Sequence, residues 1–524
     1  MGNIDQSCKT FSIHWMTLPS PPTAPLLAAQ IEDLRRITGP EGVLTQPASL
    51  TTFECDGLTL ERSAPQVVVY PRSTREAQAL LSLLARDGIP FVPRGAGTGL
   101  AGGTIALAAP VVVCTSRMKK ILEIDLDNRK ARVEAGVVNL EATRRVQEAG
   151  FHYAPDPSSQ AACTIGGNVG TNSGGPHTLK YGVTVDHVLA LTLVTPDGAI
   201  HELDIGPETG RGYDLAGLVV GHEGTFGVVT EVTIRLTRRP RAVRTLLGIF
   251  DSVADATRTV SAIIASGIVP AAVEMMDNPI LAALNAAFGM DFPEDAAAVL
   301  LIEIDGLGPS LDRQVDRIEG LCLRHHAREI RRARDEAERA RLWAARKKAF
   351  GAIGRLAPNY MTQDGVVPRT RLPEILESIR AIAQAHDVRV VNVFHAGDGN
   401  LHPCMLYDER NADEVTRVVS ASRQILEACL ELGGSLSGEH GIGVEKIDFM
   451  RKVFTPDDLD VMERLRIRQG DTLLLSETEE GLVLKPRRLD ASRLAPLRGK
   501  FPPNLLPPDI EAIRYAARDP GLRD

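Results

Sequence analysis

The sequence is poor in cysteine and in long hydrophobic runs. Its 524 residues include 7 cysteines, which lie far apart and form no C-x-x-C pair. This spacing argues against a disulfide framework and against an iron–sulfur cluster bound by this chain. The apolar stretch from Ile105 to Cys114 is interrupted by Pro110 and is shorter than the roughly 18 to 20 residues that span a bilayer. We therefore expect no transmembrane helix.

Positive charge is not in excess either. Lys and Arg total 59 against 67 Asp and Glu, so the net charge of −8 provides no global electrostatic reason to bind nucleic acid. The stretch from Met1 to Pro22 has one lysine, no arginine and no long apolar core, and so predicts neither a secretory signal nor a transit peptide. The expectation is a cytoplasmic protein without a nucleic-acid partner.

The composition is that of a globular protein, with 44% hydrophobic and 24% charged residues. From about Pro65 onward the pattern predicts short strands and helices in an α+β domain. The clearest helix is Ser73 to Asp87, with Ser73 or Thr74 as N-cap and Gly88 as its end. Strands are predicted at Gln66 to Tyr70, Ile89 to Val92, Val111 to Cys114, Lys130 to Glu134, Val188 to Thr195 and Val228 to Leu236.

A basic, proline-containing stretch from Thr237 to Arg244 predicts a boundary between domains. Beyond it, strands and long helices alternate, which favours an α/β sandwich. The predicted strands are Leu246 to Phe250, Ala298 to Asp305 and Val388 to Phe394, and the predicted helices are Ser252 to Ser266, Leu311 to Arg324 and Leu372 to Ala385.

A glycine-rich segment, PRGAGTGLAGG from Pro93 to Gly103, directly follows a predicted strand. Such glycines let backbone N–H groups approach phosphate oxygens without Cβ clashes. Gly97, Gly99 and Gly102 match G-x-G-x-x-G, but that dinucleotide motif requires a helix to begin within it, whereas Thr104 to Val113 predicts a strand. A phosphate-binding loop between strands is therefore favoured over a Rossmann site.

Two further small-residue segments lie in the same domain, GGNVGTNSGG from Gly166 to Gly175 and GHEGTFGVV from Gly221 to Val229. Any one of them alone is also compatible with a glycine-rich turn that binds nothing. Three such loops together suit a long ligand with a diphosphate and a polar ring system. FAD is the predicted ligand.

Histidine and glutamate gather in the second domain. His395 and His402 flank an Asp-Gly-Asn turn, and paired strands at Val390 to Phe394 and Leu401 to Leu406 would bring them together. Downstream, Glu439 and His440 lie in SGEHGIG. Two histidines and one carboxylate form a facial ligand set for Zn, Fe or Mn, and His440 is left as a candidate base. A single histidine would more often be structural, and the His222–Glu223 pair is not assigned to the metal.

Five segments, in this order, carry a resemblance to a known family: PRGAGTGLAGG, GGNVGTNSGGPHTLKYGVTVDHV, GHEGTFGVVTEV, FHAGDGNLHP and GGSLSGEHGIGVEK. The chain resembles the flavoproteins of the vanillyl-alcohol oxidase superfamily, in particular the branch of FAD-linked 2-hydroxyacid dehydrogenases that includes glycolate oxidase and D-lactate dehydrogenase. The resemblance implies a two-subdomain FAD-binding domain (45–240) and an α/β sandwich substrate and metal domain (241–466). A leader with an N-terminal helix (1–44) and a divergent tail (467–524) flank them.

The resemblance also implies roles for individual residues. His395, His402 and Glu439 match the metal ligands of the family, His440 its base, and Arg346 the arginine that pairs with the substrate carboxylate. The residues implied to hold FAD are Arg94, Gly95, Ala96, Gly97, Thr98, Gly99, Leu100, Pro157, Ser158, Gly167, Asn168, Gly174, Gly224, Gly227, Val228 and Val229.

The implied reaction is the oxidation of a short 2-hydroxy acid, glycolate or D-lactate, to the 2-oxo acid. The metal acidifies the hydroxyl, His440 removes its proton and C2 delivers a hydride to flavin N5. Phe350 and Thr362 stand where hydroxyglutarate enzymes of this branch have Thr and Lys, which favours a monocarboxylate, although Arg369 lies nearby in sequence and is able to compensate. The glycolate oxidase branch further implies a second flavin subunit, an iron–sulfur subunit and a place at the inner face of the cytoplasmic membrane, with electrons passed to a partner or quinone.

Three alternatives remain open. The chain is also compatible with a D-lactate or D-2-hydroxyglutarate dehydrogenase that acts alone. The tail after Arg466 lacks the Asn-Pro-x-Lys segment usual in the family, which is compatible with a non-catalytic FAD-binding subunit. A metal-dependent hydrolase without flavin would leave the three glycine-rich loops unexplained.

Overall fold

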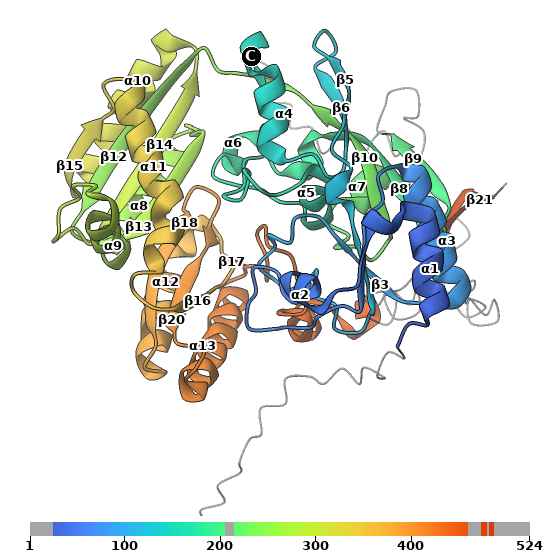
Figure 1. Cartoon of the computed structure of the whole chain (residues 1–524). Coiled ribbons are helices and arrows are strands. Elements are labelled where there is room, and N and C mark those ends of the chain that lie inside the picture. The colour runs from blue at the N-terminus through green and yellow to red at the C-terminus, as the bar shows by residue number, and fades with distance from the viewer. Residues whose placement is uncertain (1–24, 205–213, 460–472, 479–480, 487–524) are drawn as a thin grey trace, which may run out of the picture.

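The computed structural model describes residues 25–204, 214–459, 473–478 and 481–486 (Figure 1). The first 24 residues of the predicted leader lie outside the described residues. So does the predicted tail, apart from the backbone of β21 (Leu473–Thr478) and β22 (Gly481–Pro486), which pair antiparallel. No helix in the described part of the chain is both long enough and apolar enough to cross a membrane.

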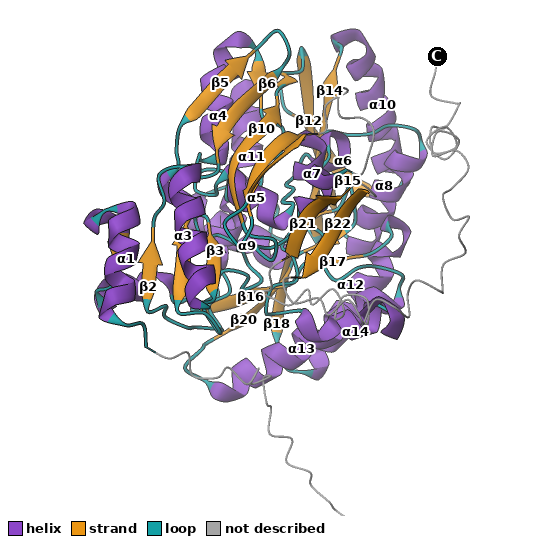
Figure 2. Ribbon diagram, turned by 90° about the vertical axis from the view of Figure 1, so that its right-hand side faces the viewer, coloured by secondary structure: helices purple, strands orange, loops and turns teal. Residues whose placement is uncertain are grey.

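The first subdomain is a four-stranded sheet in the order β1-β2-β4-β3, in which β2, β4 and β3 run parallel. Helices α1 (Ala28–Thr38) and α3 (Thr74–Asp87) lie side by side against it (Figures 1 and 2). Helix α3 begins and ends as predicted, because Ser73 Oγ accepts the Glu76 N–H and Gly88 adopts φ 66°. The strands are β1 (Val43–Leu44), β2 (Val67–Val69), β3 (Phe91–Arg94) and β4 (Val111–Cys114), and α2 (Pro47–Leu50) follows β1.

The second subdomain is a five-stranded antiparallel sheet in the order β5-β6-β10-β8-β9. Its core combines the strands with helices α4 (Asn139–Val146), α5 (Ile165–Thr171) and α7 (Leu215–Val219). The strands are β5 (Ile121–Asp125), β6 (Lys130–Glu134), β8 (Val188–Val194), β9 (Ile200–Asp204) and β10 (Val228–Arg235), with α6 (Thr178–Tyr181) before β8. The two sheets are the two predicted subdomains of the first domain.

Two predictions about the glycine-rich segments need correction. Thr104 to Pro110 form a loop and not a strand, so the connection between β3 and β4 is longer than predicted. Gly102 and Gly103 before this segment and Pro110 at its end disfavour a strand ladder there. No helix begins within the first motif, in agreement with the rejection of a Rossmann site. The first part of the second segment, Gly166 to Thr171, was predicted as a loop but instead belongs to α5, whose first turn is capped by the Thr164 side chain.

The second domain is an α/β sandwich, as predicted. Its nine-stranded sheet has the order β15-β12-β14-β13-β18-β19-β17, with β20 paired to β18 and β16 paired to β20. The strands are β12 (Ala242–Phe250), β13 (Ala272–Asp277), β14 (Ala298–Gly306), β15 (Ala327–Arg332), β16 (Asn359–Thr362), β17 (Gly365–Val366), β18 (Arg389–His395), β19 (Asn400–Leu401) and β20 (Pro403–Tyr407).

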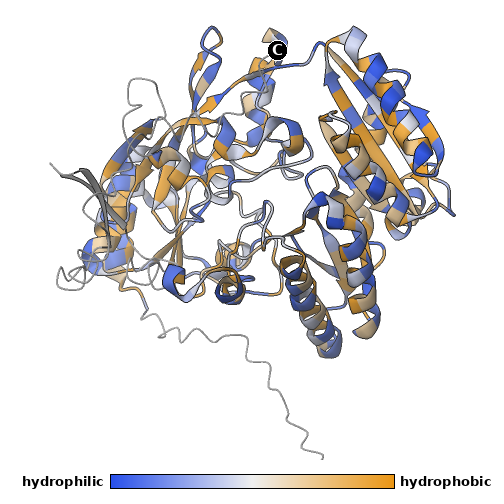
Figure 3. Ribbon diagram, turned by 180° about the vertical axis from the view of Figure 1, so that it is seen from behind, coloured by the Kyte–Doolittle hydropathy of each residue, from blue (hydrophilic) through white to orange (hydrophobic). Residues whose placement is uncertain are grey.

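Helices cover both faces of this sheet, because its buried strands are apolar on both sides. Leu246 and Met275 enter one core, whereas their neighbours Leu247 and Met276 enter the other. The first core is closed by α8 (Val253–Ala265), α10 (Gly308–Arg324), α12 (Leu372–Ala385) and α13 (Ala412–Glu431), and the second by α9 (Asn278–Phe288) and α11 (Glu336–Ile353). Figure 3 shows largely hydrophobic strands beneath helices that turn hydrophilic sides outward.

The predicted boundary segment is itself partly strand. β11 (Thr237–Arg238) pairs with β7 (Phe151–His152) of the first domain, and β12 of the second domain already begins at Ala242. The two domains are also joined by polar contacts between α6 and β14. Tyr181 donates to Asp305 at 2.5 Å, and His177 Nε2 lies 3.4 Å from Glu303. A loop that ends in the short helix α14 (Met450–Val453) returns from the second domain toward the first.

Candidate active site

Two adjoining cavities lie where loops of the first domain face the second. The larger has a volume of about 350 Å³ and the smaller about 90 Å³. Both are lined by Gly95, Gly99, Thr104, Gly167, Thr171 and His440. The first domain supplies all of these residues except His440, so His440 is the point at which the second domain reaches into both cavities.

Nearly every residue predicted to hold FAD lines one of these cavities. The loop from Gly95 to Leu100 lines the larger one with Pro157, Ser158, Gly167 and Asn168, and the smaller one is lined by Arg94, Gly224, Gly227, Val228 and Val229. Gly174 is the exception. It lines a third cavity of about 180 Å³, on the side of Glu439 where His395 also lies.

The first glycine-rich loop has backbone N–H groups that are available to bind a ligand. The backbone N–H groups of Ala96, Gly97 and Thr98 donate to no other described residue. A Cβ on Gly97, where φ is 70°, would lie 2.1 Å from the Arg94 guanidinium, which folds back to donate to Thr104 Oγ1 at 3.1 Å. Unpaired N–H groups next to a buried arginine form a positively charged anion-binding site, which fits the diphosphate of FAD.

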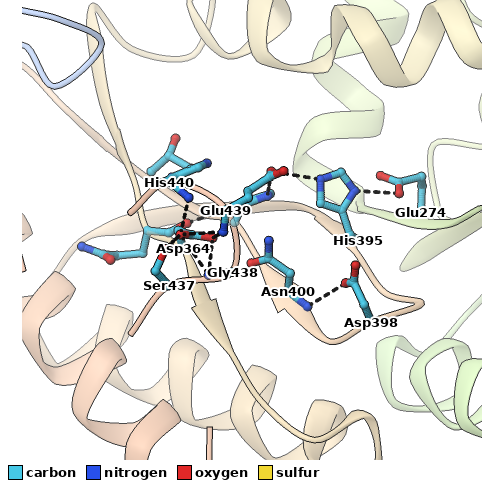
Figure 4. Close-up of polar contacts among 12 residues, drawn as sticks. Glu274, Asp364, His395, Asp398, Asn400, Ser437, Gly438, Glu439 and His440 are labelled. Carbon is cyan, nitrogen blue, oxygen red and sulfur yellow. Dashed lines mark hydrogen bonds and ion pairs between the residues drawn. The ribbon is translucent and has the colours of Figure 1, made fainter. Parts of the chain in front are cut away.

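His395, His402 and Glu439 converge on one point. His395 ends β18, His402 lies between β19 and β20, and Glu439 lies on the loop after α13. Oε1 of Glu439 is 3.3 Å from His395 Nε2 (Figure 4), and it is 3.1 Å from His402 Nε2. One ligand atom from each residue lies within 4.8 Å of the others, an arrangement that fits a divalent cation.

The strand pairing behind this site is confirmed with one correction. β18 pairs antiparallel with β20 and also with β19 at His395 and Asn400. The strand predicted from Leu401 to Leu406 is therefore divided at His402 into two short strands that belong to different ladders. This break turns His402 toward His395, and the two ring centroids are 5.1 Å apart.

The Nδ1 atoms of His395 and His402 also have hydrogen-bond partners. His395 Nδ1 lies 2.7 Å from Glu274 Oε1, and His402 Nδ1 lies 3.3 Å from the Gln363 carbonyl oxygen. Such partners direct the Nε2 atoms toward a metal. Burial alone would lower the pKa of His395, but Glu274 and Glu439 raise it well above 6.5. Burial alone would raise the pKa of Glu439, but His395 and His402 lower it well below 4.5.

His440 stacks on His402, with ring centroids 4.9 Å apart and planes 4° apart. Burial lowers the pKa of His440 to about 4, so its imidazole is neutral at neutral pH and free to accept a proton. Its Nδ1 is enclosed without a hydrogen-bond partner among the described residues. With Nδ1 closed off, Nε2 is the ring atom left for proton transfer.

The structure places Arg346 behind the predicted metal ligands and not in the wall of either cavity. It lies on α11 with its side chain 1% exposed, and its Nε donates to Glu274 Oε2 at 2.6 Å. Its Nη2 is buried without a partner among the described residues. One turn later, Phe350 does line the larger cavity.

Two buried carboxylates that were not predicted from the sequence organise this site. Glu274 is fully buried in β13 and joins Arg346 to His395. Asp364, also fully buried, accepts the N–H groups of Gly438, Glu439 and His440 at 2.8 to 3.3 Å (Figure 4). Burial alone would raise the pKa of Asp364, but His440 and Lys446 lower it. For Glu274 the available signal was an acidic residue inside an apolar strand, whereas Asp364 lies between β16 and β17 and carried no such signal.

The sequence matches two family models. Residues 65–204 match an FAD binding domain, and residues 239–467 match the C-terminal domain of FAD linked oxidases. The glycolate oxidase subunit GlcD of Escherichia coli K12 is 44% identical over 424 residues, 81% of this chain and 85% of that protein. The subunit of the same name from Bacillus subtilis is 39% identical over 83% of this chain and 93% of that protein. A D-lactate dehydrogenase of Anaerostipes hadrus is 31% identical over 83% of this chain and 94% of that protein.

Solved structures with low sequence identity share the fold. A 4-ethylphenol oxidase from Gulosibacter chungangensis superposes with a TM-score of 0.70 at 16% identity, over 85% of this chain and 95% of that one. A p-cresol methylhydroxylase superposes with a TM-score of 0.69 at 17% identity, over 83% of this chain and 92% of that one.

Proposed function

The chain belongs to the family of FAD-linked oxidases, and from this premise we propose that it oxidises a short 2-hydroxy acid, glycolate or D-lactate, to the 2-oxo acid. The observation that supports this most directly is the position of His440. Its imidazole lines both cavities predicted to hold FAD and stacks on His402 of the predicted metal triad. With FAD in these cavities and a cation on the triad, His440 would lie between a hydride acceptor and a hydroxyl-activating cation, the arrangement that oxidation of an alcohol requires.

We propose that Arg94 to Leu100, Pro157, Ser158, Gly167, Asn168, Gly174, Gly224 and Gly227 to Val229 hold FAD, and that His395, His402 and Glu439 hold Zn, Fe or Mn. When bound, FAD supplies the hydride acceptor and the cation supplies a Lewis acid that acidifies the substrate hydroxyl. His440 takes up the hydroxyl proton at Nε2. Glu274 and the Gln363 carbonyl keep the two ligand imidazoles in the tautomer that presents Nε2.

The second-domain wall of the larger cavity supports a small substrate. Phe350, Tyr360 and Thr362 line it and carry no charge, so they provide no partner for a distal carboxylate. Arg369, considered as a compensating cation, donates to the Gly397 carbonyl oxygen at 3.2 Å and lines neither cavity. We propose that Arg346 offers its unpartnered Nη2 to the substrate carboxylate once the Phe350 ring, which lines the larger cavity 5.8 Å from the guanidinium, moves aside, because Arg346 itself lines neither cavity.

The test is an absorbance spectrum of the purified protein followed by anaerobic addition of glycolate and then of D-lactate. We expect a yellow protein that is bleached by one of the two. The His440→Ala variant should keep its FAD but reduce it at least about 100-fold more slowly, as expected for loss of a general base. His386→Ala, at the end of α12, is the matched control and should behave as wild type. Normal reduction of His440→Ala would remove His440 from the role of base.

The electrons taken from the substrate must leave the reduced flavin. Two of the most similar relatives are named as subunits of glycolate oxidase, whereas another is a D-lactate dehydrogenase. The six described cysteines form no disulfide and the sequence has no C-x-x-C pair, so we assign any iron–sulfur cluster to a partner subunit. We propose a second flavin subunit and an iron–sulfur subunit as that partner, at the inner face of the cytoplasmic membrane. Rapid reoxidation of the isolated reduced protein by a soluble quinone would instead favour an enzyme that acts alone.

A further inference from the structure

The loop that carries Glu439 and His440 forms backbone hydrogen bonds to both domains. The N–H groups of Gly438, Glu439 and His440 donate to Asp364 of the second domain, and that of Gly441 to Ser437 Oγ. The next four N–H groups all donate to the first domain. The change from second-domain to first-domain acceptors thus falls between Gly441 and Ile442, one residue after the predicted base His440.

Glu223 is the first-domain carboxylate in this arrangement. Its Oε1 accepts the Ile442 N–H and its Oε2 the Gly443 N–H, both at 2.7 Å. The N–H groups of Val444 and Glu445 then donate to the carbonyl oxygen of Ala101, at 2.9 and 3.2 Å. Ala101 belongs to the glycine-rich loop that lines the cavities, and Glu223 lines the smaller cavity itself.

The backbone at Glu223 is held in a conformation that glutamate rarely adopts. Its φ is 49°, in the left-handed region, and its N–H donates to the Gly170 carbonyl oxygen at 2.7 Å. The neighbouring Gly441 leaves no space for a side chain, because a Cβ there would lie 2.7 Å from Glu223 Oε1. A strained residue that makes two charge-assisted hydrogen bonds across a domain boundary points to a functional constraint.

We propose that Glu223 is a positioning residue that fixes the Glu439–His440 loop against the flavin cavity. It lies between His222 and Gly224, which also line the smaller cavity, so its carboxylate ties the wall of that cavity to the loop of the second domain. Asp364 sets the loop relative to His395 and His402, and Glu223 sets it relative to the first domain. The effect on turnover rests on the proposed function, whereas the effect on the loop does not.

The test is Glu223→Gln in the FAD-containing full chain. The amide retains one acceptor oxygen but turns an NH2 group toward the second N–H, so one buried donor loses its acceptor. Hydrogen exchange of peptides within 437–446 should be at least about 10-fold faster than in wild type, with peptides of β18 unchanged. FAD content should stay the same, and kcat should fall about 10- to 100-fold with KM nearly constant, because the walls that bind substrate are untouched.

Glu231→Gln is the matched control. Glu231 lies eight residues further along in β10 and pairs with Arg132 at 2.6 Å, away from the loop. The Glu231→Gln variant should show the hydrogen exchange within 437–446 and the kcat of the wild type. Glu223→Asp, which keeps the charge but is too short to reach both N–H groups, should give an intermediate increase in exchange and serves if Glu223→Gln does not fold.

Unchanged exchange within 437–446 in whichever Glu223 variant folds would overturn the proposal, as would a kcat within twofold of wild type in Glu223→Gln. If neither glycolate nor D-lactate bleaches the wild-type protein, the proposed function fails, and the exchange comparison alone still decides whether Glu223 holds the loop.

Discussion

At the scale of single residues, buried charges determine the geometry of the site. Glu274 is fully enclosed, with Arg346 Nε at 2.6 Å and His395 Nδ1 at 2.7 Å. Burial alone would raise the pKa of this carboxyl, but His395 and Arg346 lower it, so it is ionised and paired. A buried carboxylate between two cations is costly to break, because loss of one charge leaves the others unpaired.

We therefore expect Glu274→Gln to lower the free energy of unfolding by about 3 to 5 kcal/mol. Metal affinity should also fall by about 10- to 100-fold, because the partner that orients His395 is lost. Urea unfolding and metal analysis after dialysis measure the two effects. Glu329→Gln, which removes an exposed partner of Arg331, should cost at most about 1 kcal/mol and serves as the control. Equal unfolding midpoints for both variants would contradict the prediction.

At the scale of elements, two glycines with similar left-handed backbone conformations have different structural roles. Gly88 ends α3 with φ 66°, and Gly97 lies in the loop after β3 with φ 70°. A side chain added at Gly88 would meet nothing within 4 Å, whereas at Gly97 it would collide with the Arg94 guanidinium. The left-handed conformation ends a helix in the first case and places the backbone against a ligand cavity in the second.

This pair provides a matched test of the FAD loop. Both Gly88→Ala and Gly97→Ala should lower the free energy of unfolding by about 1 to 2 kcal/mol through the unfavourable φ. Only Gly97→Ala should lose FAD, because Arg94 must move and the loop with it. The ratio of flavin to protein absorbance after gel filtration measures this. Full FAD content in Gly97→Ala would show that this loop does not hold the cofactor.

At the scale of the whole molecule, ion pairs join the two domains. His177 of the first domain lies 2.8 Å from Asp156 and 3.4 Å from Glu303 of the second. Burial alone would lower the pKa of His177, but Asp156 and Glu303 raise it to about 10. The ring also stacks on Trp343, with centroids 5.2 Å apart. The domain contact near the site thus contains a protonated histidine between two carboxylates.

The stability that His177 contributes should depend on pH with a definite sign. Its pKa is raised above the unfolded value of about 6.5, so the contribution is complete below pH 6.5 and is lost as pH rises toward 10. Between pH 6.5 and 10 the wild type should lose more unfolding free energy than His177→Gln. Below pH 6 the difference between the two should be constant, which provides the internal control. Parallel curves over the whole range would contradict the raised pKa.

The sequence by itself determined the features that depend on local chemistry. Ser73 and Gly88 set the ends of α3, the alternation of strands with long helices led to the α/β sandwich, and the order of five motifs identified the family. The Asp-Gly-Asn turn between His395 and His402 predicted that they meet, because turn residues act over a few positions. These signals lie close together in the chain and can be read without the rest of the molecule.

The tertiary structure alone decided which distant groups meet. The partnership of Arg346 with Glu274 joins residues that are 72 positions apart, and that of Glu223 with Ile442 joins residues 219 apart. Single acidic residues carry no periodicity that would reveal such partners. The division of a predicted strand at His402 and the folding of Gly166 to Thr171 into α5 also depended on neighbouring strands and on the Thr164 cap. Burial and strand pairing between distant segments determined these conformations. Local propensity could not predict them, because it is weak where several backbone conformations have nearly the same free energy.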